Sequence, residues 1–240
     1  MAESKPVASP AVNPWHSTNS LESADVIVPL VLRYVPARGV VDFGCKHGEW
    51  LSVFRRFGVA TILGFDQEKR AGRLAIDRAA FRVADLNQPL VVPERFDLAV
   101  CIEVAEHLLP SSAEPLVKTI TTSAPVVLFS AAAPGQGGHG HHNEQPHGYW
   151  HALFAKYGFQ PIDCLRPQIW HDRRVAFWYR QNLFFYASAA GLAAHPELAA
   201  EAARDRADDL ELVHVTLLNR PTTWQRAKNL MRRLRQKYLG

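Results

Sequence analysis

The chain of 240 residues has few cysteines and lacks a long hydrophobic run. Its three cysteines, Cys45, Cys101 and Cys164, are scattered and lie inside predicted strands or at a strand end, which favours reduced thiols over a disulfide framework. No segment approaches the roughly 20 apolar residues that cross a bilayer. The polar, proline-bearing start, Met1 to Ser17, lacks the apolar core of a secretory signal. We therefore expect a cytoplasmic protein.

Acidic residues are missing from one stretch near the C-terminus. Six basic residues and no acidic ones lie between Arg226 and Lys237, and apolar residues recur there at intervals of three and four. This pattern predicts a basic amphipathic helix. The helix could lie on an anionic membrane surface, or pack on the domain or on a second subunit of a homodimer, and we favour packing. The small net charge of +4, without aromatic-basic interleaving near the predicted site, argues against nucleic acid as a partner.

Internal repeats are also absent, and apolar runs typical of strands alternate with helical segments. A helix is predicted from Leu21 to Val35, and another from Trp150 to Tyr157. The predicted strands are 39–43, 60–65, 81–84, 96–101, 125–130, 159–166 and 182–188. The fold class is therefore α/β, a Rossmann-like doubly wound mixed sheet that is mostly parallel and ends in an antiparallel hairpin. We divide the chain into a flexible segment 1–19, a domain 20–190 and a helical extension 191–240.

The first predicted strand runs into a glycine loop, in the sequence V-V-D-F-G-C-K-H-G-E-W from Val40 to Trp50. Asp66 follows the second strand, where an acid commonly holds ribose hydroxyls. Asp42 precedes the first glycine, and a carboxylate there would repel a pyrophosphate. The same carboxylate suits a ligand with positive charge, such as S-adenosylmethionine (SAM).

From Leu21 to Ser188 the chain resembles the class I SAM-dependent methyltransferases. The first motif of that family is an acid followed by G-x-G-x-G, here Asp42 to Gly48. Segments 81–86 and 95–107 are similar to its third-strand and fourth-strand motifs. The resemblance implies that the first loop holds the methionine end of SAM, that Asp66 binds the ribose and that Asp85 accepts from the adenine amino group. The cofactor-binding residues that it implies are Asp42, Gly44, Cys45, Lys46, Gly48, Asp66, Asp85, Leu86 and Glu103.

Lys46 departs from the family pattern, because it replaces the middle glycine of the loop. Glycine is usual there where the backbone takes a positive φ or approaches a ligand closely. The ammonium could pair with the SAM carboxylate or with Glu49. A SAM-binding protein without catalysis is the alternative that Lys46 keeps open.

Two residues beyond the loop have structural alternatives. Asp85 could be a turn acid before Asn87 and Pro89. Glu103 and His107 could pair under the sheet edge, because their spacing of four puts them on one face of a helical turn. We interpret His107 as structural.

A loop rich in glycine and histidine, Ala131 to Gly148, follows the fifth strand. It resembles the P-G-Q-G-G-x-G-H-x-N-E-Q loop of a bacterial methyltransferase group associated with glycan and natural-product biosynthesis. In many small-molecule methyltransferases a histidine after this strand removes the acceptor's proton, and histidine titrates in the range that such a base needs. On this pattern His141 and Glu144 are the predicted catalytic residues. Predicted acceptor-binding residues in and after the loop are Asn143, Gln145, Tyr149 and Trp150.

Two other interpretations of the loop remain. Its histidines and Glu144 could ligate a divalent metal, but their spacing is irregular and a glycine-rich loop holds ligands poorly, so we predict no metal. Alternatively, the loop is a mobile solvent segment whose histidines have no role. Its glycine content favours a mobile lid in either case.

The segment between the two last strands, Arg166 to Asn182, is dense in aromatic and amide side chains. Trp178 and Tyr179 could bind a sugar ring or another amphipathic acceptor. They could equally be core residues of a hairpin, since strands are rich in aromatic residues.

Together these features predict a SAM-dependent O-methyltransferase that acts on a hydroxyl of a small molecule or saccharide. The cofactor is SAM and the base is His141. Alternatives are a SAM-binding protein without catalysis, an N- or C-methyltransferase, and a metal-dependent enzyme that uses the histidine loop.

Overall fold

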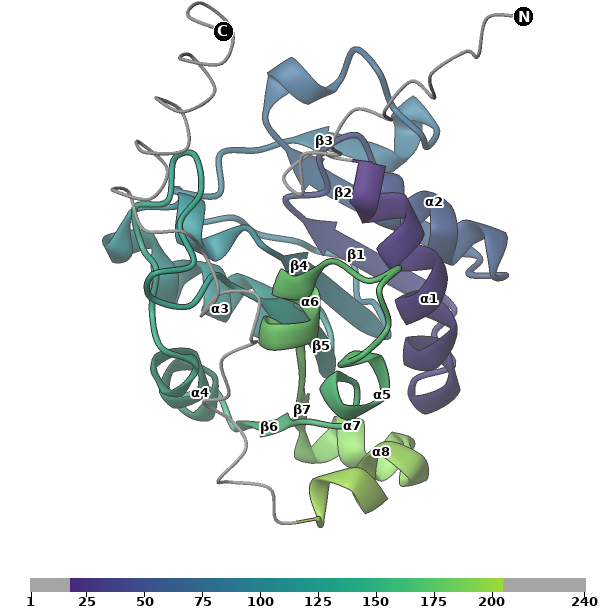
Figure 1. Ribbon diagram of the computed structural model, residues 1–240. Coiled ribbons are helices and arrows are strands. Elements are labelled where there is room, and N and C mark those ends of the chain that lie inside the picture. The colour runs from purple at the N-terminus through teal and green to yellow at the C-terminus, as the bar shows by residue number, and fades with distance from the viewer. Residues whose placement is uncertain (1–17, 205–240) are drawn as a thin grey trace, which may run out of the picture.

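The computed structural model describes residues 18–204, which form one seven-stranded sheet in the order β3-β2-β1-β4-β5-β7-β6 (Figure 1). Neighbouring strands from β3 to β5 are parallel, whereas β7 is antiparallel to both β5 and β6. The predicted fold class, with its antiparallel last pair, is confirmed. The strands are β1 (Gly39–Phe43), β2 (Thr61–Asp66), β3 (Phe81–Val83), β4 (Leu98–Ile102), β5 (Val126–Ser130), β6 (Phe159–Ile162) and β7 (Phe184–Ser188).

Helices cover both faces of the sheet, with α1 and α2 on one side and α3 and α4 on the other (Figure 1). Side chains alternate between the two faces along each strand. Val40, Leu98 and Val126 pack with α1 and α2, while their neighbours Val41 and Ala99 face α3. The helices are α1 (Thr18–Tyr34), α2 (Glu49–Arg56), α3 (Ala113–Ser123), α4 (His147–Ala155), α5 (Arg166–Ile169), α6 (Phe177–Asn182), α7 (Ala189–Ala194) and α8 (Pro196–Ala202).

The boundaries of the two late strands differ from the prediction. β6 ends at Ile162 because Asp163 turns back to pair with Arg166, at 2.6 Å between Oδ2 and Nη2, where α5 begins. β7 begins at Phe184 because the preceding residues form α6. The connection is therefore two short helices that pack over the sheet, where the sequence predicts only a link without a long helix.

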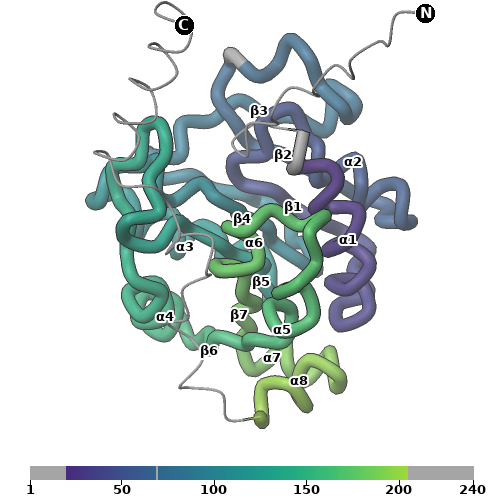
Figure 2. The backbone as a smooth tube through the Cα atoms, in the orientation of Figure 1, coloured from purple at the N-terminus to yellow at the C-terminus, as the bar shows by residue number. Residues whose placement is uncertain are grey.

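β1 and β4 are neighbours, and the chain leaves them in opposite directions, toward β2 on one side and β5 on the other. In such sheets, ligands bind beyond the carboxyl ends of the strands at this switch point. The predicted site residues follow the carboxyl ends of β1 to β5 and therefore meet at that edge. Figure 2 follows the backbone of the loop from β5 into α4.

The described part of the C-terminal extension packs on the domain, since Leu198 of α8 is fully buried in the core on the α1 side. The predicted basic helix, 226–237, and the lead-in up to residue 17 lie outside the described residues. None of the helices within residues 18–204 is long and apolar enough to cross a membrane.

Candidate active site

The loop after β1 needs glycine at its first position. Gly44 has φ +85°, and a Cβ there would lie 2.4 Å from Cγ2 of Val104, which follows β4. Lys46 also adopts a left-handed conformation, with φ +52°, although it is not glycine. The substitution in the family motif has therefore kept the backbone conformation that glycine ordinarily supplies. The Lys46 side chain is exposed.

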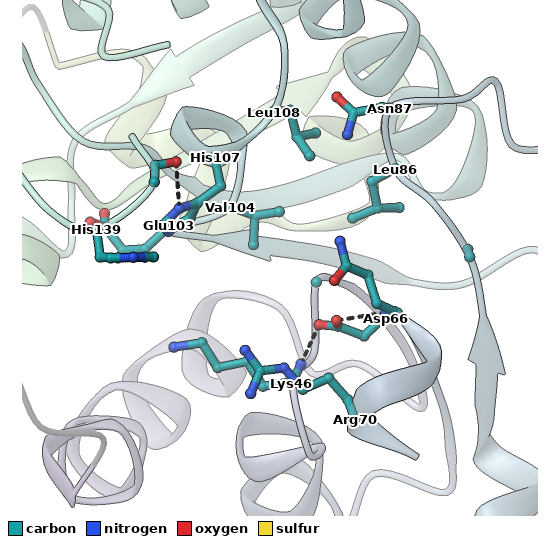
Figure 3. Close-up of a pocket in the computed structure, with 14 residues that line it drawn as sticks. Lys46, Asp66, Arg70, Leu86, Asn87, Glu103, Val104, His107, Leu108 and His139 are labelled. Carbon is teal, nitrogen blue, oxygen red and sulfur yellow. Dashed lines mark hydrogen bonds between the residues drawn. The ribbon is translucent and has the colours of Figure 1, made fainter. Parts of the chain in front are cut away.

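Asp66 ties the first two loops together. Its Oδ2 accepts from the backbone N–H of Lys46 at 2.7 Å, and its Oδ1 accepts from the N–H of Gln67 at 2.7 Å (Figure 3). Each carboxylate oxygen keeps a second lone pair. Asp66 can therefore shape the loop and still accept hydrogen bonds from a ligand.

Asp42 lies beneath this loop and is 4% exposed. Burial raises its pKa well above the usual range, and the nearby carboxylates of Asp66 and Glu49 raise it further, against a smaller lowering by Lys46. A group that is costly to ionise fits a site that receives a cationic ligand.

A cavity of about 350 Å³ opens at this edge of the sheet. In Figure 3, Lys46 and Arg70 lie on one wall, and Glu103, His107 and His139 lie on the opposite wall. Its lining residues come from the segments after β1, β2, β3, β4 and β5: Gly44, Lys46, Asp66, Gln67, Arg70, Ala84, Leu86, Asn87, Glu103, Val104, His107, Leu108, His139 and Gly140.

Five of the nine predicted cofactor residues line this cavity, namely Gly44, Lys46, Asp66, Leu86 and Glu103. Three others, Asp42, Cys45 and Gly48, do not line the cavity, because they are buried in or beneath the loop. Asp85 is exposed, and its Oδ1 accepts from the backbone N–H of Asn87 at 3.0 Å. This is the turn geometry that the alternative interpretation of Asp85 describes. Asn87 itself lines the cavity.

The end of β4 carries a second strained residue. Glu103 has φ +52°, and its backbone N–H donates to the carbonyl of Ser130 at 3.0 Å. Its carboxylate accepts from Gln136 Nε2 at 2.9 Å and from Asn182 Nδ2 at 3.1 Å. Both of these hydrogen bonds of the Glu103 carboxylate are therefore to amides. The pairing of Glu103 with His107, which is one interpretation of their spacing, is not observed.

A buried network of amides continues behind Glu103. Asn182, 1% exposed, donates from Nδ2 to Gln136 Oε1 at 2.7 Å. Its Oδ1 accepts from Gln181 Nε2 at 3.0 Å and lies 3.1 Å from His147 Nε2. The network joins β4, the histidine loop, α4 and α6, and so fixes Glu103 at the cavity wall.

Histidines from two elements meet beside the cavity. The rings of His107 and His141 form an edge-to-face pair with centroids 4.7 Å apart. His107 Nδ1 lies 3.1 Å from the carbonyl oxygen of Gly140, and His141 Nδ1 lies 2.8 Å from Glu144 Oε1. Both partners can only accept, so each Nδ1 carries the proton and each Nε2 has a free lone pair. Burial, with His141 nearby, lowers the pKa of His107.

Glu106 lies next to this pair and is 1% exposed. Burial raises its pKa well above the usual range, and the carboxylate of Glu103 adds to the effect. Its Oε2 has no hydrogen-bond partner among the described residues.

The histidine loop is anchored at several points, where the sequence predicts a mobile lid. Glu144 accepts from the backbone N–H groups of Gly135 at 2.8 Å and Gly137 at 2.6 Å, besides holding His141. The backbone N–H groups of His142 and Asn143 donate to the carbonyl of Glu106 at 2.8 and 3.0 Å. Gly138 lets the ring of His141 approach, because a Cβ there would lie 2.3 Å from its Nε2. The predicted catalytic pair, His141 and Glu144, is thus brought together.

The other predicted acceptor residues are dispersed, and none of them lines the cavity. Asn143 is buried and accepts from Gln145 at 2.9 Å, and Tyr149 is half-buried on the α3–α4 side of the core. Trp150 packs against Phe129 in the core. Trp178 and Tyr179 belong to the core on the α1 side, and burial raises the pKa of Tyr179 to about 12. For Trp178 and Tyr179 the structure shows the core packing that the alternative interpretation describes. Trp150, predicted only as an acceptor-binding residue, is also a core residue.

Sequence reasoning missed several site residues. The sequence does not single out Glu106 within its motif, favours a structural role for His107, and assigns no contact to Gln136 or Asn182. The spacing of Glu103, Glu106 and His107 is a signal for Glu106 and His107, whereas no local signal indicates Gln136 or Asn182.

A family model described as a methyltransferase domain matches residues 22–133. Residues 22–133 are therefore similar to a methyltransferase domain. The matched segment contains the loops after β1 to β4, and so most of the cavity wall. No curated protein matches the chain in sequence.

Three solved structures illustrate the similarity in fold, and two of them are described as methyltransferases. The methyltransferase domain of bacterial CtHen1 is 19% identical, with a TM-score of 0.52, and the match covers 70% of this chain and 97% of that one. DesVI of Streptomyces venezuelae is 13% identical, with a TM-score of 0.53 and coverage of 72% and 93%. The small RNA methyltransferase HEN1 is 13% identical, with a TM-score of 0.51, but the match covers 27% of its chain against 78% of this one. Similarity to a methyltransferase domain makes SAM the ligand to test against this cavity.

The residues of the cavity fit SAM. Its volume lies within the usual range of small-molecule sites, about 300–1,000 Å³. Asp66 and Glu103, together with buried Asp42, suit the positive charges of the sulfonium and ammonium groups, and Lys46 and Arg70 offer partners for the carboxylate.

Proposed function

We propose that the protein is an O-methyltransferase that transfers the methyl group of SAM to a hydroxyl of a small molecule or a saccharide. The observation that carries this proposal is the position of the His141–Glu144 pair, beside a cavity whose opposite wall is shaped for SAM. SAM supplies a methyl group on a positively charged sulfur.

Cofactor binding is assigned to the first three loops. The backbone from Gly44 to Lys46 and the carboxylate of Asp66 would hold the donor, and Leu86 and Asn87 would line the end of the cavity nearest β3. Glu103 is fixed by Gln136 and Asn182 and would face the positive end of the donor. A rigid wall of this kind lowers the barrier by alignment, since methyl transfer requires the acceptor oxygen in line with the sulfur–carbon bond.

Proton removal is assigned to His141. Glu144 holds the proton on Nδ1, so that Nε2 can accept the proton of the hydroxyl. Glu144 is itself oriented by the backbone N–H groups of Gly135 and Gly137. Dependence on a base distinguishes hydroxyl acceptors from more nucleophilic ones, and this is why we favour O-methylation.

Labelled methyl transfer tests the proposal. The protein is incubated with SAM labelled in the methyl group and with fractionated small-molecule and saccharide extracts, and the labelled product is identified by mass. His141→Ala should lower turnover by about 100-fold or more, in line with the usual contribution of a positioned base, and should leave the dissociation constant of SAM unchanged.

His142→Ala is the matched control, because His142 is exposed in the same loop and should keep full turnover. Full activity of His141→Ala would overturn the base assignment. Binding of SAM and of its demethylated product without transfer to any fraction would favour a SAM-binding protein without catalysis.

A further inference from the structure

Three side chains beside the cavity have donor atoms that converge. One nitrogen each of His107 and His141 and one carboxylate oxygen of Glu106 all lie within 4.8 Å of one another. We propose that they bind a divalent first-row transition-metal ion, and that its open positions face an oxygen ligand of the acceptor. The binding of the ion does not depend on the proposed function. Its role toward an acceptor does.

The donor set is that of a metal site. Two imidazole nitrogens and one carboxylate are the ligands of many catalytic zinc and iron centres, which keep further positions open. Around one tetrahedral ion with ligand bonds of about 2.0–2.2 Å, donor atoms lie about 3.3–3.6 Å apart. The three donor atoms lie within 4.8 Å of one another, so binding of an ion requires the side chains to rotate inward by about 1 Å.

The hydrogen bonds of both histidines prepare them as ligands. The carbonyl of Gly140 and the carboxylate of Glu144 hold the Nδ1 protons, which leaves the two Nε2 lone pairs free. Metal-bound histidines typically donate their other N–H to a carbonyl or a carboxylate in this way. The sequence predicts no metal because the loop histidines are irregularly spaced, but two of the three ligands come from the segment after β4.

An independent observation points to a missing ligand. Glu106 is 1% exposed, and its Oε2 has no partner among residues 18–204. Buried carboxylate oxygens in folded proteins are nearly always paired, and an unpaired one calls for an explanation. A cation among Glu106, His107 and His141 supplies that partner.

The ion changes what His141 does. A metal ligand cannot accept a proton on the same lone pair, so in the ion-bound protein His141 would hold the ion. The ion would polarise a hydroxyl that coordinates it, and the proton of that hydroxyl would pass to water. The two roles of His141 require different residues. As a base, His141 needs only Glu144, whereas as a metal ligand it also needs Glu106 and His107.

Metal binding to the full chain is the test. After chelation and dialysis, Zn²⁺ binding is measured by calorimetry and Mn²⁺ binding by electron paramagnetic resonance. We expect one ion per chain, with Mg²⁺ a weak competitor because imidazole suits it poorly. Glu106→Gln and His107→Ala should each weaken binding by at least tenfold, and Glu144→Gln by 10- to 100-fold, as loss of a supporting contact does.

Matched controls exclude adventitious binding by surface histidines. His139→Ala and His142→Ala remove histidines of the same loop that do not belong to the cluster, and binding should be unchanged. His107 lines the cavity and does not belong to the hydrophobic core, so its substitution tests the site without threatening the core. Absence of one-to-one binding, or equal binding in the His107→Ala and His142→Ala variants, would overturn the ion site.

The outcome of this test is separable from that of the proposed function. If the chain binds no ion but transfers methyl groups through His141, the ion site is wrong and the methyltransferase proposal stands. If one ion binds through the cluster but no acceptor is methylated, the ion site stands and the acceptor proposal is wrong.

Discussion

The two walls of the cavity are built in different ways. The wall with Lys46 and Arg70 is named the cofactor wall after the proposed function, and its short loops are held by contacts close in sequence, such as the Asp66 carboxylate on the Lys46 N–H, 20 positions away. The opposite wall, with Glu103, His107 and His139, is named the acceptor wall in the same sense. There Glu103 is held by side chains 33 and 79 positions away, from a glycine-rich loop and from α6. The first wall depends on backbone conformation, and the second depends on a network of buried polar side chains. Substitutions should therefore affect them differently.

The largest effect is expected for Gly44→Ala on the cofactor wall. The new Cβ would clash with Val104 and would force a positive φ on alanine, so the loop must move. We expect SAM affinity to fall by at least about 100-fold, since this corresponds to about 2.7 kcal/mol of lost contacts. Calorimetric titration with SAM measures it.

Gly58→Ala is the control for this variant. Gly58 has φ +93°, but a Cβ there meets nothing within 4 Å. It should lose about 1 kcal/mol of stability from backbone strain and keep its SAM affinity. Equal SAM affinity in the two variants would show that the cofactor wall does not rely on the close approach of Gly44.

A smaller effect is expected for Asn182→Leu on the acceptor wall. The change removes one buried hydrogen-bond partner from each of Glu103, Gln136 and Gln181, which should lower the free energy of unfolding by about 3 kcal/mol. Chemical denaturation measures it. Gln160→Leu replaces an exposed amide of β6 and should change stability by less than about 0.5 kcal/mol. If the two variants lost the same stability, the network would not support this wall.

The smallest effect, of opposite sign, is expected for Asp42→Asn. The pKa of Asp42 is higher in the folded than in the unfolded chain, where it is about 3.9, so ionisation favours unfolding. Ionisation of Asp42 should therefore lower the free energy of unfolding of the native protein as pH rises above about 4. The variant has no carboxyl at this position and should not show this decrease. At pH 7 the variant should be more stable than the native protein, and the difference should shrink as pH falls toward 4.

Asp97→Asn is the control for the sign. Asp97 Oδ2 accepts from the N–H groups of Arg38 and Gly39 at 2.7 and 2.9 Å, so its loss should destabilise the fold. Denaturation curves between pH 4 and 7 measure both variants. If the native protein were more stable than Asp42→Asn at pH 7, the prediction that ionisation of buried Asp42 destabilises the fold would be wrong.

The difference between the walls also explains what could be predicted from the sequence. The strands follow from apolar runs and turn residues, and Gly44 and Asp66 follow from their positions after strands, because local sequence determines those contacts. The meeting of His107 with His141, 34 positions later, depends on the path of a loop that has no periodicity. Trp150 and Tyr179 were misleading, because aromatic side chains suit both sugar binding and a core, and only packing decides between them.

Glu144 has a thermodynamic consequence that extends beyond its contact with His141. By holding the N–H groups of Gly135 and Gly137, one carboxylate restrains a stretch of chain that would otherwise sample many conformations. The conformational entropy of the glycines is thus lost when the protein folds, before any ligand arrives. An acceptor that binds beneath this loop meets a surface that is already ordered, so most of its binding free energy remains available for affinity and alignment.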